Sequence, residues 1–377
     1  MNRASNADSS VIHPRLRRTA LLSLAIPVLL VSFAATLAAQ SPATRQDTAR
    51  QDAARQDTAH EDTARQDTAH EDTVLDRQLA AIAAAHQGRV ALFAQNLRTG
   101  QTASLSPDLP VQTASVIKMG ILLDAAEQLR AAKATLDERL VLTKANQVPG
   151  SGVLGVLTPP IALTLRDTLM LMVVLSDNTA TNMAIDRLGL AHINATLRAA
   201  GLRQTVLYKK VYLPPSGPMP ADQPKFGLGK TTPRQMASIM SRFARCNLAL
   251  GHSAPLPGDG PLCGRILHML RSQQDRDSLP RYIESLDTSE HGSAIANKTG
   301  ALDRVRNDVA LISTKSGPVV IAAFTFDNQD QRWTGDNEAE KTLGRLAQAI
   351  VNRWSPGGLD AGAFPWQNPL APAKAAP

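Results

Sequence analysis

The segment from Val74 to Trp354 has strand patterns near both of its ends and helical patterns between them, which restricts the folds open to it. Val90–Phe93 and Thr102–Leu105 predict two strands joined by a turn at Thr99-Gly100. Three later strands are expected, at 293–298, 309–313 and 318–326. The pattern predicts one sheet that is closed by both ends of the segment, with a helical lobe inserted between them.

Helices are expected before, between and after these strands along the chain. Near the start of the segment, apolar residues recur at helical spacing: Leu75, Leu79, Ile82 and Ala83. Helical stretches then dominate to about Leu270, and a last amphipathic helix is predicted over 338–353. A chain of 377 residues with 43% hydrophobic residues has enough apolar material for a large core.

The first 39 residues predict a signal peptide. Arg15, Arg17 and Arg18 precede an apolar stretch over 20–38 that ends in small residues, with cleavage expected after Ala38 or the next alanine. An uncleaved membrane anchor is the alternative, because the stretch approaches the roughly 20 residues that span a bilayer. Either way we expect export, to the periplasm or the medium.

Two further segments of low complexity flank the predicted domain. Residues 45–74 are six near-copies of a five-residue unit such as RQDTA, and the unit contains no large apolar side chain. Stacked copies would bury almost nothing, so we interpret 40–73 as a polar tether rather than a solenoid. Residues 355–377 are rich in Pro, Ala and Gly and predict a disordered tail.

The formal net charge of +7 raises the question of nucleic-acid binding. Aromatic residues make up only 3% of the chain, the basic residues are scattered, and no nucleic-acid-binding motif occurs. We therefore expect no nucleic-acid partner, and relate the charge to association with an anionic cell envelope. The histidines lack ligand spacing, and His291 is interpreted as structural, so no metal or cofactor is expected.

Chemistry is indicated first by Ser115-Val116-Ile117-Lys118, which opens an apolar helix. Positions i and i+3 lie on one face of a helix, so the lysine amine can reach the serine hydroxyl. A lysine whose pKa is lowered by burial and positive neighbours could accept the serine proton. Taken alone, the motif is also typical of a serine that caps a helix and a lysine that lies on the surface.

Two further motifs follow in the same domain. Ser176-Asp177-Asn178 starts a helix, where capping is the simpler interpretation. Lys298-Thr299-Gly300 ends a late strand, where the glycine would let a substrate backbone approach a sheet edge. Each tripeptide is weak alone, but the three in this order are a specific signal.

With these motifs the sequence resembles the class A β-lactamases and their penicillin-binding relatives. Further agreement comes from the segments 150–154, 231–233 and 305–309. The resemblance covers 74–354 and implies an α+β fold of the DD-peptidase/β-lactamase type. Such a fold has an antiparallel sheet formed by both chain ends, flanked by helices, with a helical lobe.

The resemblance also implies roles for residues. Lys118 would activate Ser115, and Ser176 would pass the proton to the leaving nitrogen. Substrate would be bound by Asn178, Lys298, Thr299, Gly300, Ala301 and Arg306. Within that set Asn178 would bind the side-chain amide, Lys298 and Thr299 the carboxylate with Arg306 as a helper, and the N–H groups of Ser115 and Ala301 the oxyanion.

One feature of the family is missing. Class A β-lactamases carry a glutamate on the omega loop that activates the deacylating water. This chain has no glutamate between Glu138 and Glu284, and the family's usual interval leads to Val211 or Tyr212. Tyr212 or the downstream Asp222 could assist instead, although an ordinary loop residue is the simpler interpretation of each.

The missing glutamate leaves three functional hypotheses. The first is a monomeric β-lactamase-type serine hydrolase that is acylated at Ser115 by a small β-lactam and deacylates slowly. The second is a D-alanyl-D-alanine carboxypeptidase or esterase acting on a peptidoglycan-like substrate. The third is a penicillin-binding sensor that stays acylated. The lifetime of the acyl-enzyme distinguishes them.

Cys246 and Cys263 flank a segment rich in Gly and Pro between two predicted helices. In an oxidising compartment a disulfide between them would close this loop. Two reduced, buried thiols are the alternative.

Overall fold

The computed structural model describes residues 72–252, 254–283 and 293–366. The expected signal peptide, residues 40–71 of the expected tether, His291 and residues 367–377 of the expected tail lie outside the described residues. In the described part of the chain, no helix is long and apolar enough to cross a membrane.

A five-stranded antiparallel sheet forms the centre of the domain, in the order β2-β1-β10-β9-β8. Its strands are β1 (Arg89–Asn96), β2 (Thr102–Leu105), β8 (Ile295–Leu302), β9 (Val305–Ile312) and β10 (Val319–Phe326). β10 lies between strands from both ends of the domain and is buried on both faces, which explains its continuous apolar run. The expected α+β fold, with an antiparallel sheet made by both chain ends, is confirmed.

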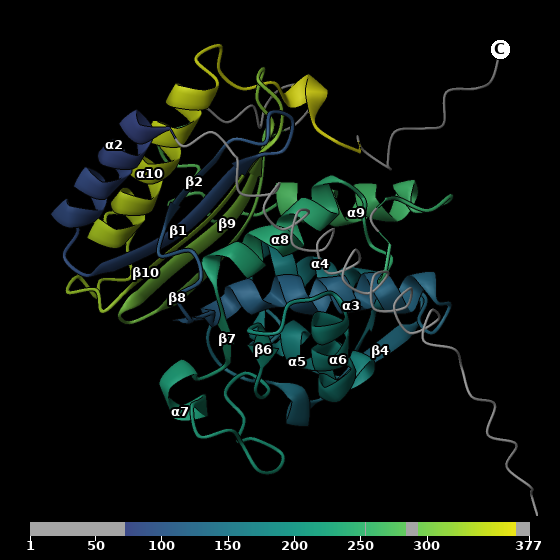
Figure 1. The fold of residues 1–377 in the computed structure, drawn as a ribbon. Helices are drawn as coiled ribbons and strands as arrows, with labels where there is room; N and C mark the ends of the chain where they lie inside the picture. Colours follow the sequence, from purple (N-terminus) through teal and green to yellow (C-terminus); the bar gives the residue numbers. More distant parts are fainter. Residues whose placement is uncertain (1–71, 253, 284–292, 367–377) are drawn as a thin grey trace, which may run out of the picture. The chain divides into compact units, whose positions relative to one another are not determined.

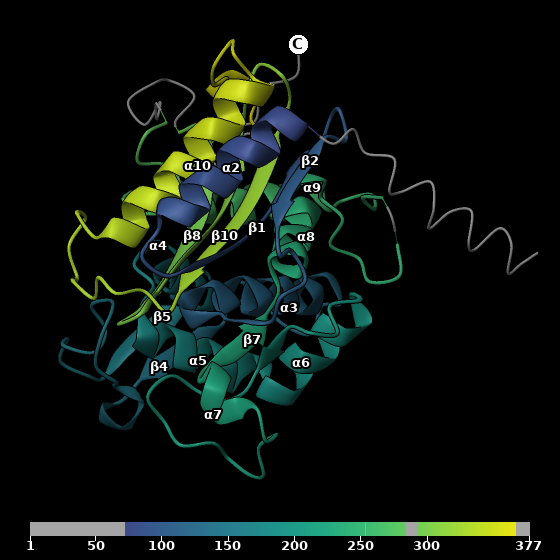
Figure 2. The ribbon, with the colours of Figure 1, turned by 60° about the vertical axis from the view of Figure 1, so that its left-hand side comes forward.

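Helices cover both faces of this sheet (Figures 1 and 2). The helices α2 (Thr73–Ala85) and α10 (Glu338–Trp354) pack together on one face. The helices α8 (Pro233–Ala244) and α9 (Gly260–Arg271) contact the other face. The sheet therefore separates two hydrophobic cores, and alternate residues of each strand face one or the other.

The core on the α8 and α9 face of the sheet, called the second core, continues into a helical lobe. This lobe lies below α8 and α9 in Figure 1. It contains α3 (Lys118–Arg130), α4 (Leu165–Val174), α5 (Asn178–Leu188), α6 (Leu190–Ala199) and the short α7 (Gln223–Phe226). Local sequence sets where these helices begin. Thr164 and Asp177, for example, accept hydrogen bonds from the first turns of α4 and α5.

Five short strands within the middle region were not predicted. They form a three-stranded sheet and a hairpin, made of β3 (Val111–Gln112), β4 (Arg139–Leu142), β5 (Ile161–Thr164), β6 (Val206–Leu207) and β7 (Gly229–Thr231). Strands of two to four residues are too short to show an alternating pattern, so pairing with distant segments determines them.

The described start of the expected disordered tail is folded, so the prediction is wrong for residues 355–366. Leu359 forms a β-bridge with Thr314, and Phe364 is buried in the second core. The Trp366 indole N–H donates to the Ala244 carbonyl at 3.1 Å. A segment rich in Pro, Ala and Gly is held here by a few apolar and aromatic anchors that its composition does not reveal.

The predicted Cys246–Cys263 disulfide is present, with the two Cα atoms 5.5 Å apart. It closes the loop between α8 and α9, beside the face of the sheet that these helices cover.

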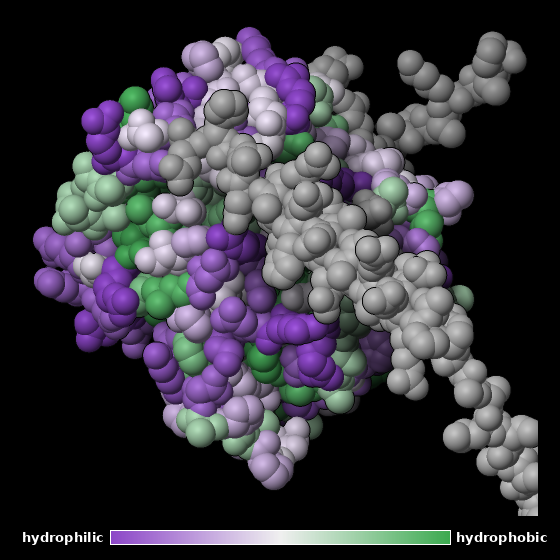
Figure 3. Space-filling view, in the orientation of Figure 1, coloured by the Kyte–Doolittle hydropathy of each residue, from purple (hydrophilic) through white to green (hydrophobic). Residues whose placement is uncertain are grey.

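Hydrophilic residues dominate the domain face shown in Figure 3, and hydrophobic residues form smaller groups among them.

Candidate active site

Ser115 lies where the edge strand β8 meets the start of α3. A short 3-10 turn, Ala114–Ile117, leads into this helix, and Ala114 has a left-handed backbone with φ of 43°. A Cβ atom on Gly300 would lie 2.9 Å from the backbone nitrogens of Ser115 and Val116. The glycine is therefore required because the serine turn packs directly on β8, a closer constraint than the substrate approach expected from sequence.

Lys118 is fully buried one turn after Ser115. Its Nζ donates to the Ser176 carbonyl at 2.6 Å, to Ser176 Oγ at 3.0 Å and to Asn178 Oδ1 at 3.2 Å. Among the described residues no hydrogen bond joins Lys118 to the Ser115 hydroxyl. Burial, helped by the charge of Lys298, holds the pKa of the Lys118 amine well below its usual value, against the opposing effect of Asp177.

Lys298 lies on β8 and also contacts Ser176. Its Nζ donates to Ser176 Oγ at 3.1 Å and to the Thr299 carbonyl at 2.8 Å. Burial lowers the pKa of Lys298 to about 8, opposed by Asp275 and Asp308. The Ser176 hydroxyl thus lies between two buried amines whose protonated forms are both disfavoured.

Asp177 lies between Ser176 and Asn178 and holds the backbone around both residues. Asp177 caps α5 by accepting from the Ala180 N–H, and its other oxygen accepts from the N–H groups of Val153 and Leu154 at 2.7 and 2.8 Å. Ser176 has a left-handed backbone, with φ of 53°. The capping interpretation therefore holds for Asp177, while the residues on either side contact Lys118.

Asn178 is the first residue of α5 and lies beside Lys118. Its Oδ1 accepts from Lys118, and its Nδ2 donates to the Pro149 carbonyl at 3.1 Å. Thr299, Gly300 and Ala301 continue along the edge strand β8. The structure therefore gathers eight of the nine predicted residues at one junction, from Ser115 to Ala301.

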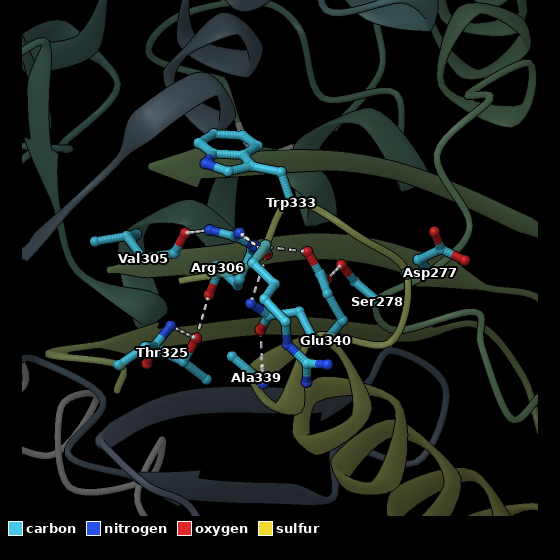
Figure 4. A network of polar contacts seen from close by, with 12 residues as sticks. Asp277, Ser278, Val305, Arg306, Thr325, Trp333, Ala339 and Glu340 are labelled. Atoms are coloured by element: carbon cyan, nitrogen blue, oxygen red, sulfur yellow. Dashed lines mark hydrogen bonds and ion pairs between the residues drawn. The ribbon is translucent and has the colours of Figure 1, made fainter. Parts of the chain in front are cut away.

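Arg306 is the exception, and the structure does not support its predicted role as a carboxylate helper. It lies on β9, one strand inside the edge, on the face covered by α10 (Figure 4). Its guanidinium forms an ion pair with Glu340 at 3.1 Å and donates to the Arg332 carbonyl at 2.8 Å. The Trp333 ring covers it at 4.7 Å, leaving the side chain 3% exposed. These contacts make Arg306 a residue that holds α10 to the sheet.

The loop that would carry the missing glutamate is held by Asn182, a residue that sequence analysis overlooked. Asn182 Oδ1 accepts from the Val211 N–H at 2.8 Å, and its Nδ2 donates to the Val211 carbonyl at 3.0 Å. Asn182 follows Asn178 by four positions on α5, so helical spacing from the second motif could have indicated it. The Val211 side chain is buried, whereas Tyr212 is 64% exposed.

The carboxylate of Asp222 is bound by two other side chains. One carboxylate oxygen accepts from the Tyr208 hydroxyl at 2.8 Å, and the other accepts from Lys230 at 2.5 Å. The hydrogen bond from Lys230, followed by that from Tyr208, lowers the pKa of this carboxyl group. The geometry therefore gives no support to Asp222 as a substitute for the glutamate.

Asn307 lies in the segment 305–309, which sequence analysis noted without assigning a role to this residue. Its Nδ2 donates to the carbonyls of Gln112 and Thr113, at 2.9 and 3.2 Å, which ties β9 to the serine turn. No motif marks this contact, because it joins segments almost 200 residues apart. Among the described residues no cluster of three or more His, Cys, Asp or Glu side chains could hold a metal ion.

Comparison with known proteins agrees with this geometry. The model of a β-lactamase enzyme family matches residues 74–354. A β-lactamase from Sphaerobacter thermophilus DSM 20745 is 28% identical, with a TM-score of 0.62, over 73% of this chain and 95% of that chain. PBP-A is 24% identical, with a TM-score of 0.60, over 74% and 96%. An ancestral class A β-lactamase is 21% identical, with a TM-score of 0.58, over 74% and 99%.

No curated protein matches the chain. Fold and motifs together define a penicillin-recognising serine hydrolase. Because the family model covers nearly the whole domain, the chain belongs to the β-lactamase enzyme family.

Proposed function

We propose that this protein is a β-lactamase-type hydrolase that is acylated at Ser115 by small cyclic amides and deacylates slowly. The observation that carries the proposal is the position of Ser176 Oγ, 3.0 Å from Lys118 Nζ and 3.1 Å from Lys298 Nζ. A proton taken from Ser115 by Lys118 has a route through Ser176 to a leaving nitrogen.

In the acylation step, Ser115 Oγ attacks the amide carbonyl while neutral Lys118 accepts its proton. The N–H groups of Ser115 and Ala301 stabilise the oxyanion, typically by about 3 kcal/mol each. Ser176 then delivers a proton to the amide nitrogen as the C–N bond breaks, leaving an ester on Ser115. Lys298 and Thr299 hold the substrate carboxylate, and Asn178 holds its side-chain amide.

Deacylation needs a water activated by a general base. The loop supplies the apolar, buried Val211 where the resemblance expects a carboxylate. We therefore propose a long-lived acyl-enzyme.

A D-alanyl-D-alanine carboxypeptidase or esterase remains the second candidate, because the acylation groups serve either substrate and PBP-A shares the fold. A non-hydrolysing sensor would differ from both in holding its acyl group for hours.

We also propose that the protein acts outside the cytoplasm as a monomer. The disulfide between Cys246 and Cys263 supports an oxidising compartment. The basic chain, with a net charge of +7, supports association with an anionic envelope.

Intact-mass analysis with benzylpenicillin, followed by peptide mapping, tests the proposal. We expect one equivalent of adduct on Ser115 and no adduct in Ser115→Ala. An adduct on another residue, or labelling that survives this substitution, would overturn it.

A further inference from the structure

Tyr212 combines strong exposure with an unusual backbone at the border of the candidate site. Its side chain is 64% exposed, and its φ of 57° is left-handed, which is uncommon for a bulky residue. Ala114 and Ser176 share this conformation, and both lie in the site itself. Because such conformations cost energy and concentrate at functional sites, Tyr212 is a candidate for a function.

The surrounding chain determines where the Tyr212 ring lies. Asn182 holds both backbone groups of the preceding Val211, so the start of this turn is fixed. A Cβ atom on Gly150 would lie 3.0 Å from Tyr212 Cε2, 3.2 Å from its hydroxyl oxygen and 2.7 Å from Asn178 Nδ2. The ring therefore lies across Gly150, next to the amide of Asn178.

Gly150 fits this arrangement for two reasons. Its φ of 90° disfavours any residue with a side chain, and the space that a Cβ would take is already bounded by Tyr212 and Asn178. The next residue, Ser151, accepts a hydrogen bond from the Asn178 N–H at 3.0 Å, which ties this loop to α5. Val153, two residues further on, is 40% exposed and adds apolar surface to this loop.

We propose that Tyr212 is the aromatic wall of a subsite for the acyl side chain of the substrate, and that the enzyme prefers planar aromatic acyl groups. This inference rests on the proposed function, in which Asn178 binds the side-chain amide. Asn178 Nδ2 and the Tyr212 ring both border the space above Gly150, so a group attached to that amide would be within reach of the ring. An exposed tyrosine face offers an offset or edge-to-face contact to an aromatic ring.

The proposal assigns the role to the ring rather than to the hydroxyl group. Among the described residues, no hydrogen bond from another side chain or from the backbone orients the Tyr212 hydroxyl. Stacking needs only the ring, so phenylalanine should replace tyrosine with little loss. Activation of a deacylating water would need the hydroxyl instead.

The test compares acylation of Ser115 by benzylpenicillin and by 6-aminopenicillanic acid, which has the same ring nucleus without the aromatic acyl group. The ratio of their second-order acylation rate constants isolates the contribution of the side chain. We expect Tyr212→Ala to lower this ratio by about threefold to tenfold, and Tyr212→Phe to keep it within about twofold. Tyr282→Ala is the matched control, because Tyr282 is an exposed tyrosine packed near Gly344 of α10, and it should leave the ratio unchanged.

An unchanged ratio in Tyr212→Ala would overturn the subsite while leaving acylation at Ser115 intact. An equal loss in Tyr212→Phe and Tyr212→Ala would also overturn it, since the hydroxyl would then be responsible. Failure of both compounds to acylate the natural protein would instead overturn the proposed function, and the subsite with it.

Discussion

At the scale of single residues, the site brings two buried lysines to one serine hydroxyl, that of Ser176. Lys118 and Lys298 come from elements 180 residues apart, and each donates to Ser176 Oγ. Burial and the charge of Lys298 both disfavour the protonated form of Lys118, which favours its role as a base. Burial lowers the pKa of Lys298 only to about 8, so most of its charge remains at neutral pH, whereas the pKa of Lys118 is held well below its usual value.

Replacing Lys118 with alanine should slow acylation by at least about a hundredfold, the lower range for a lost general base. Stopped-flow or quenched-flow mass analysis with benzylpenicillin measures the rate. Lys133→Ala is the matched control, because Lys133 is an exposed lysine just beyond the end of the same helix. Unchanged acylation in Lys118→Ala would show that the lysine is only a neighbour.

The pH dependence of substrate capture should report on Lys298. Since the pKa of Lys298 is about 8, its charge is present below that pH and is lost as the pH rises through it. Preference for benzylpenicillin over its methyl ester should therefore decline with a midpoint near pH 8. In Lys298→Arg the preference should persist to higher pH, because arginine stays charged. A preference that is constant across this range would contradict the assignment.

Sequence motifs identified the residues that the structure brings together at the candidate site, but not the residues that support them. Ser115 and Lys118 are one helical turn apart, so local spacing was sufficient. The face on which Arg306 lies depends on strand register, which a short motif does not determine. Asn182 and Asn307 bind backbone groups of distant segments. Helical spacing from Asn178 could have indicated Asn182, but no local pattern predicts the contact of Asn307.

At the scale of elements, the loop after β6 is the part whose chemistry departs most from the family. Its backbone at Val211 is held by α5, so the loop has a defined geometry without a carboxylate. The edge strand β8 continues to Leu302, beyond the predicted end at Lys298, and this extension brings Gly300 against the serine turn. Pairing with β9 determines how far β8 extends. The turn between the two strands is short, and sequence analysis did not predict the extension.

Val211→Glu should shorten the lifetime of the acyl-enzyme. A general base contributes about a hundredfold or more when it is correctly placed, and Asn182 already fixes the backbone of this position. Val211→Gln is the matched control, because glutamine has nearly the same size but is not a base. Intact-mass decay of the benzylpenicillin adduct measures release. Equal lifetimes in the two variants would show that this position does not face the ester.

Removing the disulfide should destabilise the α8–α9 connection. Replacing both Cys246 and Cys263 with serine should lower the free energy of unfolding by about 3 kcal/mol, by the loop-entropy relation for a loop of this size. Urea unfolding of oxidised natural protein, reduced natural protein and the double variant measures the change. Equal stability of the oxidised and reduced natural protein would count against a stabilising bridge.

At the scale of the whole domain, the site depends on segments that are far apart in the sequence. Ser115 and Ser176 come from the helical lobe, while Lys298 comes from a sheet that both ends of the domain complete. Sequence patterns predicted strands at both ends but not their order, because β10 pairs with β1 across more than 200 residues. The candidate site therefore forms only when the sheet and the lobe pack together.

The most direct test of the whole account is pre-steady-state turnover of a chromogenic cephalosporin by the natural protein. The account predicts a burst of about one product equivalent per enzyme, followed by a steady rate at least about a hundredfold slower than the burst. The burst should be absent in Ser115→Ala. Rapid turnover without a burst would contradict slow deacylation, and the absence of any reaction would contradict acylation at Ser115.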